Sequence, residues 1–224
     1  MSFIALVGYR GRMAKALQEA CEQQGHAFKV FSEHAPSELQ ISEWKDCLGI
    51  VDFSYPAVAS AVAALAVDAK IPLVSGTTGW EKNNSAKEVY AEAATKIPVV
   101  WDSNFSLGIE LTCQIAELLG RHIGSSLKII DIHHVHKKDA PSGTALKLEK
   151  RFQEVSSQPV EIQSVREGEV FGEHRLWIEF GNENLEIVHR ALSRQPFAAG
   201  ALKALQWATK QRPGFYTMKE VLGS

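Results

Sequence analysis

The sequence has few cysteines, no long apolar run and almost no net charge. Its three cysteines, Cys21, Cys47 and Cys113, lie far apart and form no CxxC pair, so we expect reduced thiols rather than a zinc site or a redox motif. The most apolar stretch, residues 57–67, falls well short of the ~20 residues that a membrane span requires. Lysine and arginine total 24 against 26 acidic residues, which argues against nucleic-acid or membrane partners.

The sequence also lacks the features of a secretory leader. An apolar segment, Phe3–Val7, follows almost directly on Met1, with no basic region and no small-residue cleavage site. It therefore predicts a buried strand rather than a signal peptide, and we expect a cytoplasmic location. The 224 residues are 45% hydrophobic and 22% charged, as in an ordinary globular protein, and fit one large or two small domains.

The first part of the chain has the pattern of a parallel sheet covered by helices. Short β-branched apolar segments alternate with segments of helical periodicity. The expected strands are Phe3–Val7, His26–Phe31, Gly49–Phe53, Ile71–Ser75 and Pro98–Trp101. The expected helices run from Arg12 to Gln24 with Gly25 after the last turn, from Pro56 to about Asp68, and onward from a cap at Asn84 or Ser85.

The pattern changes after Asn104. Here we expect helices over 106–122, 142–154 and 197–210, and strands over 127–135, 160–166, 174–181 and 185–189. The last three strands have no helix between them, which predicts antiparallel pairing. The predicted fold is therefore α/β, with a Rossmann-like domain over residues 1–104, an α+β domain with a mixed sheet over 105–194, and residues 195–224 packing back onto the first domain.

A glycine turn joins the first expected strand to the first expected helix. Its residues, 8–14, read GYRGRMA. Glycine lets backbone amides approach a pyrophosphate at the positive end of a helix, and Gly11 and Ala14 would let the helix lie close to the strand. Glu33, about 20 residues further on, is the candidate that would hold an adenosine ribose. The alternatives are a glycine turn without a ligand and a solvated acid in a loop.

Two further loops carry candidate polar groups. The Gly76-Thr77-Thr78-Gly79 loop follows a strand, at the edge where open α/β sheets bind ligands, although an ordinary polar turn has the same composition. The second is residues 131–145, DIHHVHKKDAPSGTA. In it Ser142 is a good N-cap, so that Gly143 and Thr144 offer unpaired amides to a carboxylate. Lys137 would neutralise an acid group, and a neighbouring histidine would donate a proton near neutral pH.

The three histidines of this segment also raise the possibility of a metal site. His134 and His136 share one strand face, but no third ligand lies at a recognisable spacing, and two adjacent lysines oppose a dication. We therefore expect no metal; ordinary surface histidines remain the other alternative. Cys113 falls within an expected helix and fits a core position better than that of a nucleophile.

Together these motifs resemble those of the 4-hydroxy-tetrahydrodipicolinate reductase family, the dihydrodipicolinate reductases of bacterial lysine biosynthesis. The resemblance spans nearly the whole chain, in order. It rests on GxxGRM at the N-terminus, VDFSxP at 51–56, GTTG at 76–79, SNFSxG at 103–108, HHxHKxDAPSGTA at 133–145 and HRAxSRxxFAxGA at 189–201. The block at 133–145 is highly specific, whereas a glycine turn alone is not.

The resemblance implies a role for each candidate residue. A nicotinamide cofactor, NADH or NADPH, would bind at Gly8, Tyr9, Arg10, Gly11, Arg12 and Met13, near Glu33 at its ribose, and near Gly76, Thr77, Thr78, Asp102, Ser103, Asn104 and Phe105 at its nicotinamide. His133 would be proton donor and acceptor and Lys137 a second donor, while His134, Gly143 and Thr144 would bind a cyclic dicarboxylate substrate. Such enzymes reduce this substrate by hydride transfer and protonation. They are usually homotetramers joined through the second domain's sheet, and they close their two domains on substrate.

The sequence leaves the choice of cofactor open and admits two rival functions. Glu33 would repel a 2′-phosphate, whereas Arg12 would attract one. By the resemblance, His34 occupies a position where relatives that accept NADP tend to be basic. The first rival is a catalytically silent dinucleotide-sensing protein, which would need a damaged proton-donor block, and none is visible. The second is another two-domain dehydrogenase such as aspartate-semialdehyde dehydrogenase, which needs a cysteine nucleophile that Cys113 is poorly placed to supply.

Overall fold

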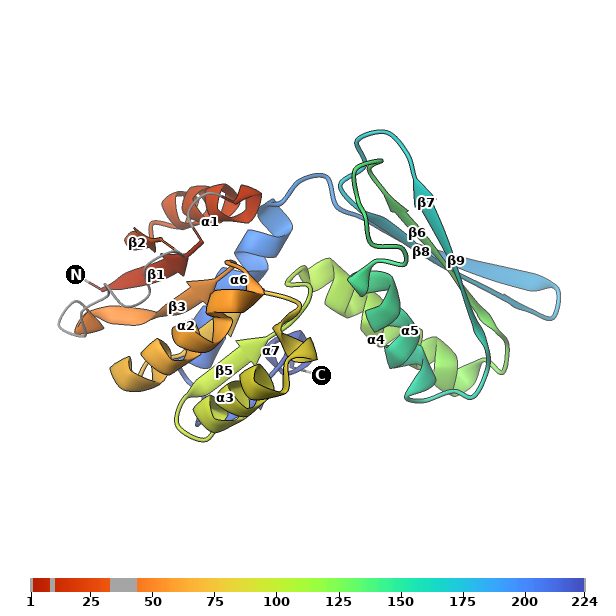
Figure 1. The fold of residues 1–224 in the computed structure, drawn as a ribbon. Coiled ribbons are helices and arrows are strands. Elements are labelled where there is room, and N and C mark those ends of the chain that lie inside the picture. Colours follow the sequence, from red (N-terminus) through yellow and green to blue (C-terminus); the bar gives the residue numbers. More distant parts are fainter. Residues whose placement is uncertain (1, 9–10, 33–43, 224) are drawn as a thin grey trace. The chain divides into compact units, whose positions relative to one another are not determined.

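The chain forms two compact units in a computed structural model that describes residues 2–8, 11–32 and 44–223 (Figure 1). Unit 1 comprises residues 1–106 and 195–224, and unit 2 comprises residues 107–194. Glu33 and His34, named above as cofactor determinants, lie outside the described residues, as do Tyr9 and Arg10.

Unit 1 is built on a six-stranded sheet in the order β10-β5-β4-β3-β1-β2, in which every pairing is parallel. Its elements are β1 (Phe3–Val7), α1 (Arg12–Gln23), β2 (Phe28–Phe31), β3 (Cys47–Asp52), α2 (Pro56–Ala69), β4 (Leu73–Ser75), the short 3₁₀ helix η3 (Trp80–Lys82), α3 (Asn84–Ala94), β5 (Pro98–Trp101), α6 (Gln195–Ala208), β10 (Gly214–Tyr216) and α7 (Met218–Leu222). Helix α1 packs beside α6, and α2 packs beside α3. The Rossmann-like fold expected from the sequence is confirmed.

The local signals of unit 1 explain most of these boundaries. Gly25, at φ +70°, follows the last turn of α1, where a left-handed residue commonly ends a helix. The predicted cap of α3 was wrong by one or two residues: Asn83 caps the helix, and its side chain accepts from the amides of Ser85 and Ala86. Strand β10 and helix α7 were not predicted, because each is too short for its periodicity to stand out.

Unit 2 has a four-stranded sheet in the order β7-β6-β8-β9. Its elements are α4 (Leu107–His122), β6 (Leu127–His133), α5 (Gly143–Gln153), β7 (Val160–Arg166), β8 (Glu173–Phe180) and β9 (Glu183–Arg190). Strand β8 pairs antiparallel with β6 and with β9, but β7 pairs parallel with β6. The expected antiparallel pairing of the last three strands was therefore wrong for β7. The reason is that α5 provides the crossover that parallel neighbours need.

Helices α4 and α5 lie on one face of the unit 2 sheet (Figure 1). Between them Arg151 of α5 is buried and contacts Glu117 and Glu110 of α4, the second at 2.9 Å. Lys147 adds a second cation 3.0 Å from Glu110. A charged cluster thus sits inside an otherwise apolar helix interface.

All three cysteines are free and buried, as expected, and Cys113 is a core residue of α4. Among the described residues, no helix is both long and apolar enough to cross a membrane.

Candidate functional site

The glycine turn of unit 1 is shaped by close backbone contacts at Gly8. This residue has a φ of +101°, and a Cβ placed on it would lie 2.8 Å from the carbonyl oxygen of Phe53. A side chain is therefore excluded by both conformation and space. At Gly11 the reason given above does not hold: among the described atoms, a Cβ there would meet only the Met13 amide, at 4.0 Å. Gly11 is instead the N-cap of α1, and no side chain of the described residues caps that helix, so its first amides are placed to bind an anion.

A buried carboxylate, Asp52, organises the carboxyl ends of β3 and β4. It accepts from the amide of Ser54 at 3.0 Å, and from the hydroxyls of Ser54 at 2.5 Å and of Ser75 and Thr77 at 2.9 Å each. Burial raises the pKa of Asp52, and these hydrogen bonds oppose the shift. The Thr77 hydroxyl is thus turned inward, whereas Thr78 is exposed. Sequence reasoning gave Asp52 no role, although its position after a buried strand could have suggested one.

The loop 102–105 is held by its own polar side chains. Asp102 is buried and accepts from the amides of Asn104 at 3.0 Å and of Met218 at 3.1 Å. Its carboxylate therefore faces the start of α7. Phe105 is buried against the ring of Phe53, with 5.6 Å between ring centres, while Ser103 is exposed. Exposed groups of this loop are the ones that remain available to a ligand.

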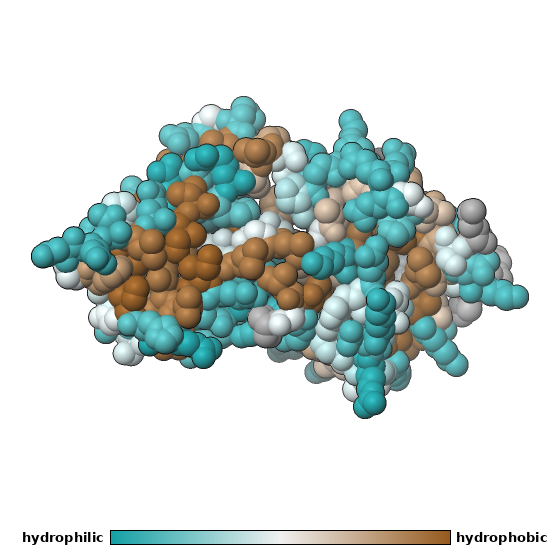
Figure 2. Space-filling view, turned by 180° about the vertical axis from the view of Figure 1, so that it is seen from behind, coloured by the Kyte–Doolittle hydropathy of each residue, from teal (hydrophilic) through white to brown (hydrophobic). Residues whose placement is uncertain are grey.

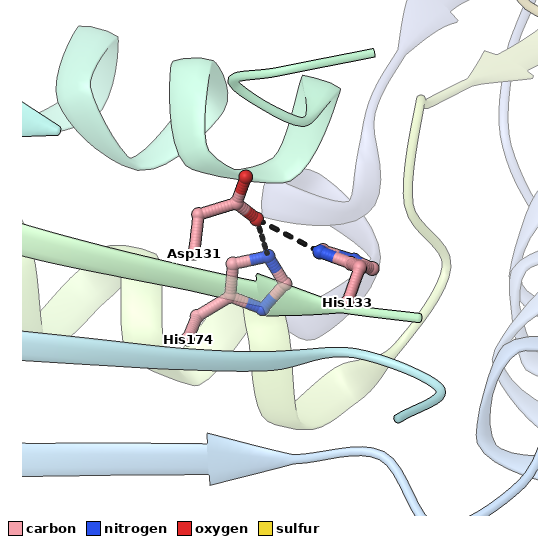
Figure 3. A group of neighbouring side chains, drawn as sticks. All are labelled: Asp131, His133 and His174. Carbon is pink, nitrogen blue, oxygen red and sulfur yellow. Dashed lines mark ion pairs between the residues drawn. The ribbon is translucent and has the colours of Figure 1, made fainter. Parts of the chain in front are cut away.

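In unit 2, three side chains meet at the end of β6 (Figure 3). Asp131 and His133 lie two residues apart on one strand face, and His174 pairs with Asp131 across the β6–β8 register. Nδ1 of His133 lies 3.0 Å, and Nε2 of His174 lies 3.4 Å, from the same oxygen, Oδ1 of Asp131. All three residues are buried. Two imidazoles therefore share one carboxylate oxygen.

The other oxygen of Asp131 is fully engaged. Oδ2 accepts from the Ser142 amide at 2.9 Å, from Arg166 at 3.1 Å and from the Ser164 hydroxyl at 3.3 Å. Burial alone would raise the pKa of Asp131, but His133, His174 and Ser142 together hold that pKa well below its usual range. Burial lowers the pKa of His174, a shift that Asp131 opposes. The cluster thus contains an ionised carboxylate beside a histidine that remains neutral at pH 7.

The predicted substrate residues follow directly on this cluster. Ser142 is the N-cap of α5, as predicted, and its side chain accepts from the Ala145 amide at 3.2 Å. Gly143 at the first position of the helix is exposed, and Thr144 is buried. Lys137 pairs with Asp139 at 2.8 Å, and His134 lies partly exposed just beyond β6. The structure therefore places His133, Ser142 and the start of α5 around one carboxylate.

Sequence reasoning missed four members of this cluster. Asp131 precedes His133 by two residues, so strand alternation could have found it. Arg166, Ser164 and His174 come from neighbouring strands, and only the strand register brings them to Asp131. No local signal in the sequence contains that register.

Asp131, His133 and His174 are close enough to one another to be considered as metal ligands. The candidate ligand atoms of Asp131, His133 and His174 all lie within 4.8 Å of one another. However, the guanidinium of Arg166 already contacts the carboxylate, and a fixed cation there opposes a dication. We therefore assign to Asp131 an ion pair with Arg166 rather than a metal.

Known proteins resemble this chain along nearly its whole length. It is 36% identical over 250 residues to the 4-hydroxy-tetrahydrodipicolinate reductase of Zymomonas mobilis, an alignment that covers 98% of this chain and 96% of the relative. It is 35% identical to the enzyme of the same name from Akkermansia muciniphila, with 100% and 98% covered.

Solved structures share the fold. The dipicolinate-bound dihydrodipicolinate reductase from Paenisporosarcina sp. TG-14 has a TM-score of 0.81 at 19% identity, covering 98% of this chain and 99% of that one. Aspartate semialdehyde dehydrogenase II from Vibrio cholerae is less similar, with a TM-score of 0.59 at 10% identity, covering 92% and 98%. The family descriptions of the N-terminus and C-terminus of dihydrodipicolinate reductase match residues 3–105 and 106–222, and the chain therefore belongs to the dihydrodipicolinate reductase family.

Proposed function

We propose that this chain reduces 4-hydroxy-tetrahydrodipicolinate, by way of dihydrodipicolinate, to tetrahydrodipicolinate with a nicotinamide cofactor, in lysine and diaminopimelate biosynthesis. The observation that carries the proposal is the position of His133. This histidine ends β6 beside an ionised carboxylate and near the start of α5, in a chain that matches the reductase family over both of its units.

The residues of unit 1 fit a dinucleotide. A Cβ at Gly8 would fill the space beside the turn, and α1 starts without a side-chain cap, as a pyrophosphate site requires. We propose that Gly8, Gly11, Arg12 and Met13 hold the phosphates and that the loops 76–78 and 102–105 lie near the nicotinamide. Tyr9, Arg10 and Glu33 complete the proposed set. The bound cofactor, NADH or NADPH, would supply the hydride.

Unit 2 would bind the diacid and supply the proton. The first amides of α5, at Gly143 and Thr144, would donate hydrogen bonds to one carboxylate, and His134 and the Lys137 ammonium would bind or neutralise the other. His133 would then protonate the reduced ring as a general acid, with Lys137 as a second donor. In this proposal residues 105–194 are the substrate-binding and oligomerisation domain.

A homotetramer is part of the proposal. The surface of unit 2 carries patches of apolar side chains (Figure 2). On the sheet face opposite to the α4–α5 core, Val188 of β9 is exposed, and Leu192 just after β9 is exposed as well. Exposed apolar groups of this kind favour association. A cytoplasmic location, with no nucleic-acid or membrane partner, also stays a prediction.

The first test is an assay coupled to dihydrodipicolinate synthase, run with NADH and NADPH side by side. The purified chain should oxidise one or both cofactors only when the synthase product is present. The H133A variant should turn over roughly 10² times more slowly, because a general acid is lost. Full activity in this variant would remove His133 from the mechanism, and an inactive wild type that still binds cofactor would favour a dinucleotide sensor.

A second substitution tests Lys137. The K137A variant should lower kcat/KM, because a cation near the developing charge is lost. An unaltered kcat/KM would mean that Lys137 serves only its ion pair with Asp139.

The aspartate-semialdehyde alternative is disfavoured by Cys113, which is fully buried in α4, since a nucleophile must reach its substrate.

A further inference from the structure

We infer that Asp131 is a positioning residue for His133, a fixed buried anion that favours the protonated ring from the side opposite to the substrate. The inference rests on the proposed function, because it takes His133 to be the proton donor. It concerns a residue that touches neither of the proposed ligands.

The carboxylate of Asp131 is fixed without any help from His133. Its Oδ2 accepts from three donors on two elements other than its own strand, β6: the amide of Ser142 at the start of α5, and the guanidinium of Arg166 and the hydroxyl of Ser164 on β7. The side chain is completely buried. Its orientation is therefore set by the fold of unit 2 and persists whether or not His133 carries a proton.

Oδ1 of Asp131, the oxygen that faces the two imidazoles, has no assigned hydrogen-bond partner in the described residues, and neither has Nδ1 of His133. A buried acceptor without a partner costs free energy, so such groups are rare and call for an explanation. Here the two atoms lie 3.0 Å apart, within the range of an N–H···O hydrogen bond. A hydrogen on Nδ1 would satisfy both atoms, which fixes the ring orientation and the Nδ1–H tautomer. The negative charge of Asp131 then favours a second proton on Nε2.

The opposite edge of the His133 ring is the one left for substrate. Nδ1 is buried, so proton exchange falls to Nε2. A Cβ added to Gly172 would lie 3.0 Å from this Nε2. Glycine at this position therefore keeps space open beside the nitrogen that we expect to transfer the proton.

The other charged and titratable groups around the cluster decide whether a given substitution should favour or disfavour protonated His133. Arg166 is the cation in direct contact with Asp131. His174 lies beside the same carboxylate, with His189 behind it at 6.4 Å between ring centres, and burial lowers the pKa of both of these rings. Lys137 is a further cation near His174. Removing the anion should therefore disfavour protonated His133, whereas removing the Arg166 cation should favour it.

The experiment compares D131N and R166Q with the wild type. Asparagine keeps an oxygen for the Ser142 amide but loses the charge. In D131N the alkaline limb of the kcat/KM profile should move down by about one pH unit. The activity should then be ~10-fold lower on the alkaline side and close to wild type on the acidic side. In R166Q the same limb should move to higher pH. S164A, which removes one neutral donor to the same oxygen, should leave the limb in place.

A second readout needs no substrate. The ring resonances of His133, followed by NMR on the labelled full chain, should titrate at lower pH in D131N and at higher pH in R166Q. A merely structural role for Asp131 would lower stability without moving the two variants in opposite directions. Unmoved titrations in folded variants would overturn the inference, even if the proposed reaction is confirmed. If D131N does not fold, R166Q alone decides. If the wild type is inactive in the coupled assay, the proposed function fails while the NMR result stands separately.

Discussion

Two buried aspartates show how strongly the surroundings of one residue type decide its behaviour. Asp52 is surrounded by neutral donors, three hydroxyls and an amide, and burial raises its pKa. Asp131 is equally buried, but imidazoles and the Ser142 donor hold its pKa below the usual range. A carboxylate without ionic partners fits a role in organising loops, whereas one beside two histidines fits a role in electrostatics.

The buried His174 should make stability depend on pH. An unfolded histidine takes up a proton below about pH 6.5, whereas burial lowers the pKa of the folded His174 ring. The unfolded state therefore binds more protons in that range, and the free energy of unfolding should fall as the pH drops from 6.5 toward the folded pKa. Urea unfolding at pH 7.5 and 5.5 should show this loss, and a smaller loss in H174N. The exposed His122 provides the control, H122N, which should lose as much stability as the wild type.

Arg151 is expected to be critical for the stability of unit 2. Replacing it by alanine would leave Glu117 and the completely buried Glu110 without their main cation. Breaking such a buried pair costs about 3–5 kcal/mol. Urea unfolding of R151A, followed by circular dichroism, should show a loss of this size. The K96A variant removes a pair with Glu92 on the surface and should change the midpoint very little; equal effects of the two variants would contradict the argument.

At the scale of single elements, helix α6 depends on a glycine for its close packing. A Cβ on Gly200 would lie 1.8 Å from the carbonyl oxygen of Phe105, so backbone would have to move. The helix propensity of alanine would favour G200A by about 1 kcal/mol, yet we expect a clear loss of thermal stability. A199G, at an exposed position of the same helix, should lose only about 1 kcal/mol. A stabilised G200A would show that the contact can relax.

The elements themselves were largely predictable because their signals are local. Strands β1, β5 and β7 match the predicted ranges, since apolar runs bounded by glycine and proline are read directly from the chain. The parallel partner of β7 was not predictable in this way, because pairing depends on where α5 places the strand. The candidate site likewise combines residues that a local motif reveals with residues that only the strand register brings together. His133 and Ser142 were found from a local motif, but Arg166 and His174 reach Asp131 only through strand register.

At the scale of the whole molecule, unit 1 is assembled from two distant parts of the chain. Helix α6 contributes buried residues such as Leu202 and Leu205, and β10 extends the sheet beside β5. A fragment ending at Ser106 should therefore fail to melt cooperatively and should not bind NADH or NADPH, because it leaves core surface exposed. Calorimetry and cofactor fluorescence would test this, with the full chain as control. A cooperative, cofactor-binding fragment would show that residues 195–224 are dispensable.

This arrangement also bears on how the protein is made. Unit 2 is continuous, from 107 to 194, whereas unit 1 needs residues 195–224. During synthesis the later-encoded unit can reach its native form while the earlier one still waits for its last helix to leave the ribosome. We therefore expect the two units to mature in the reverse of the order in which most of their residues are translated.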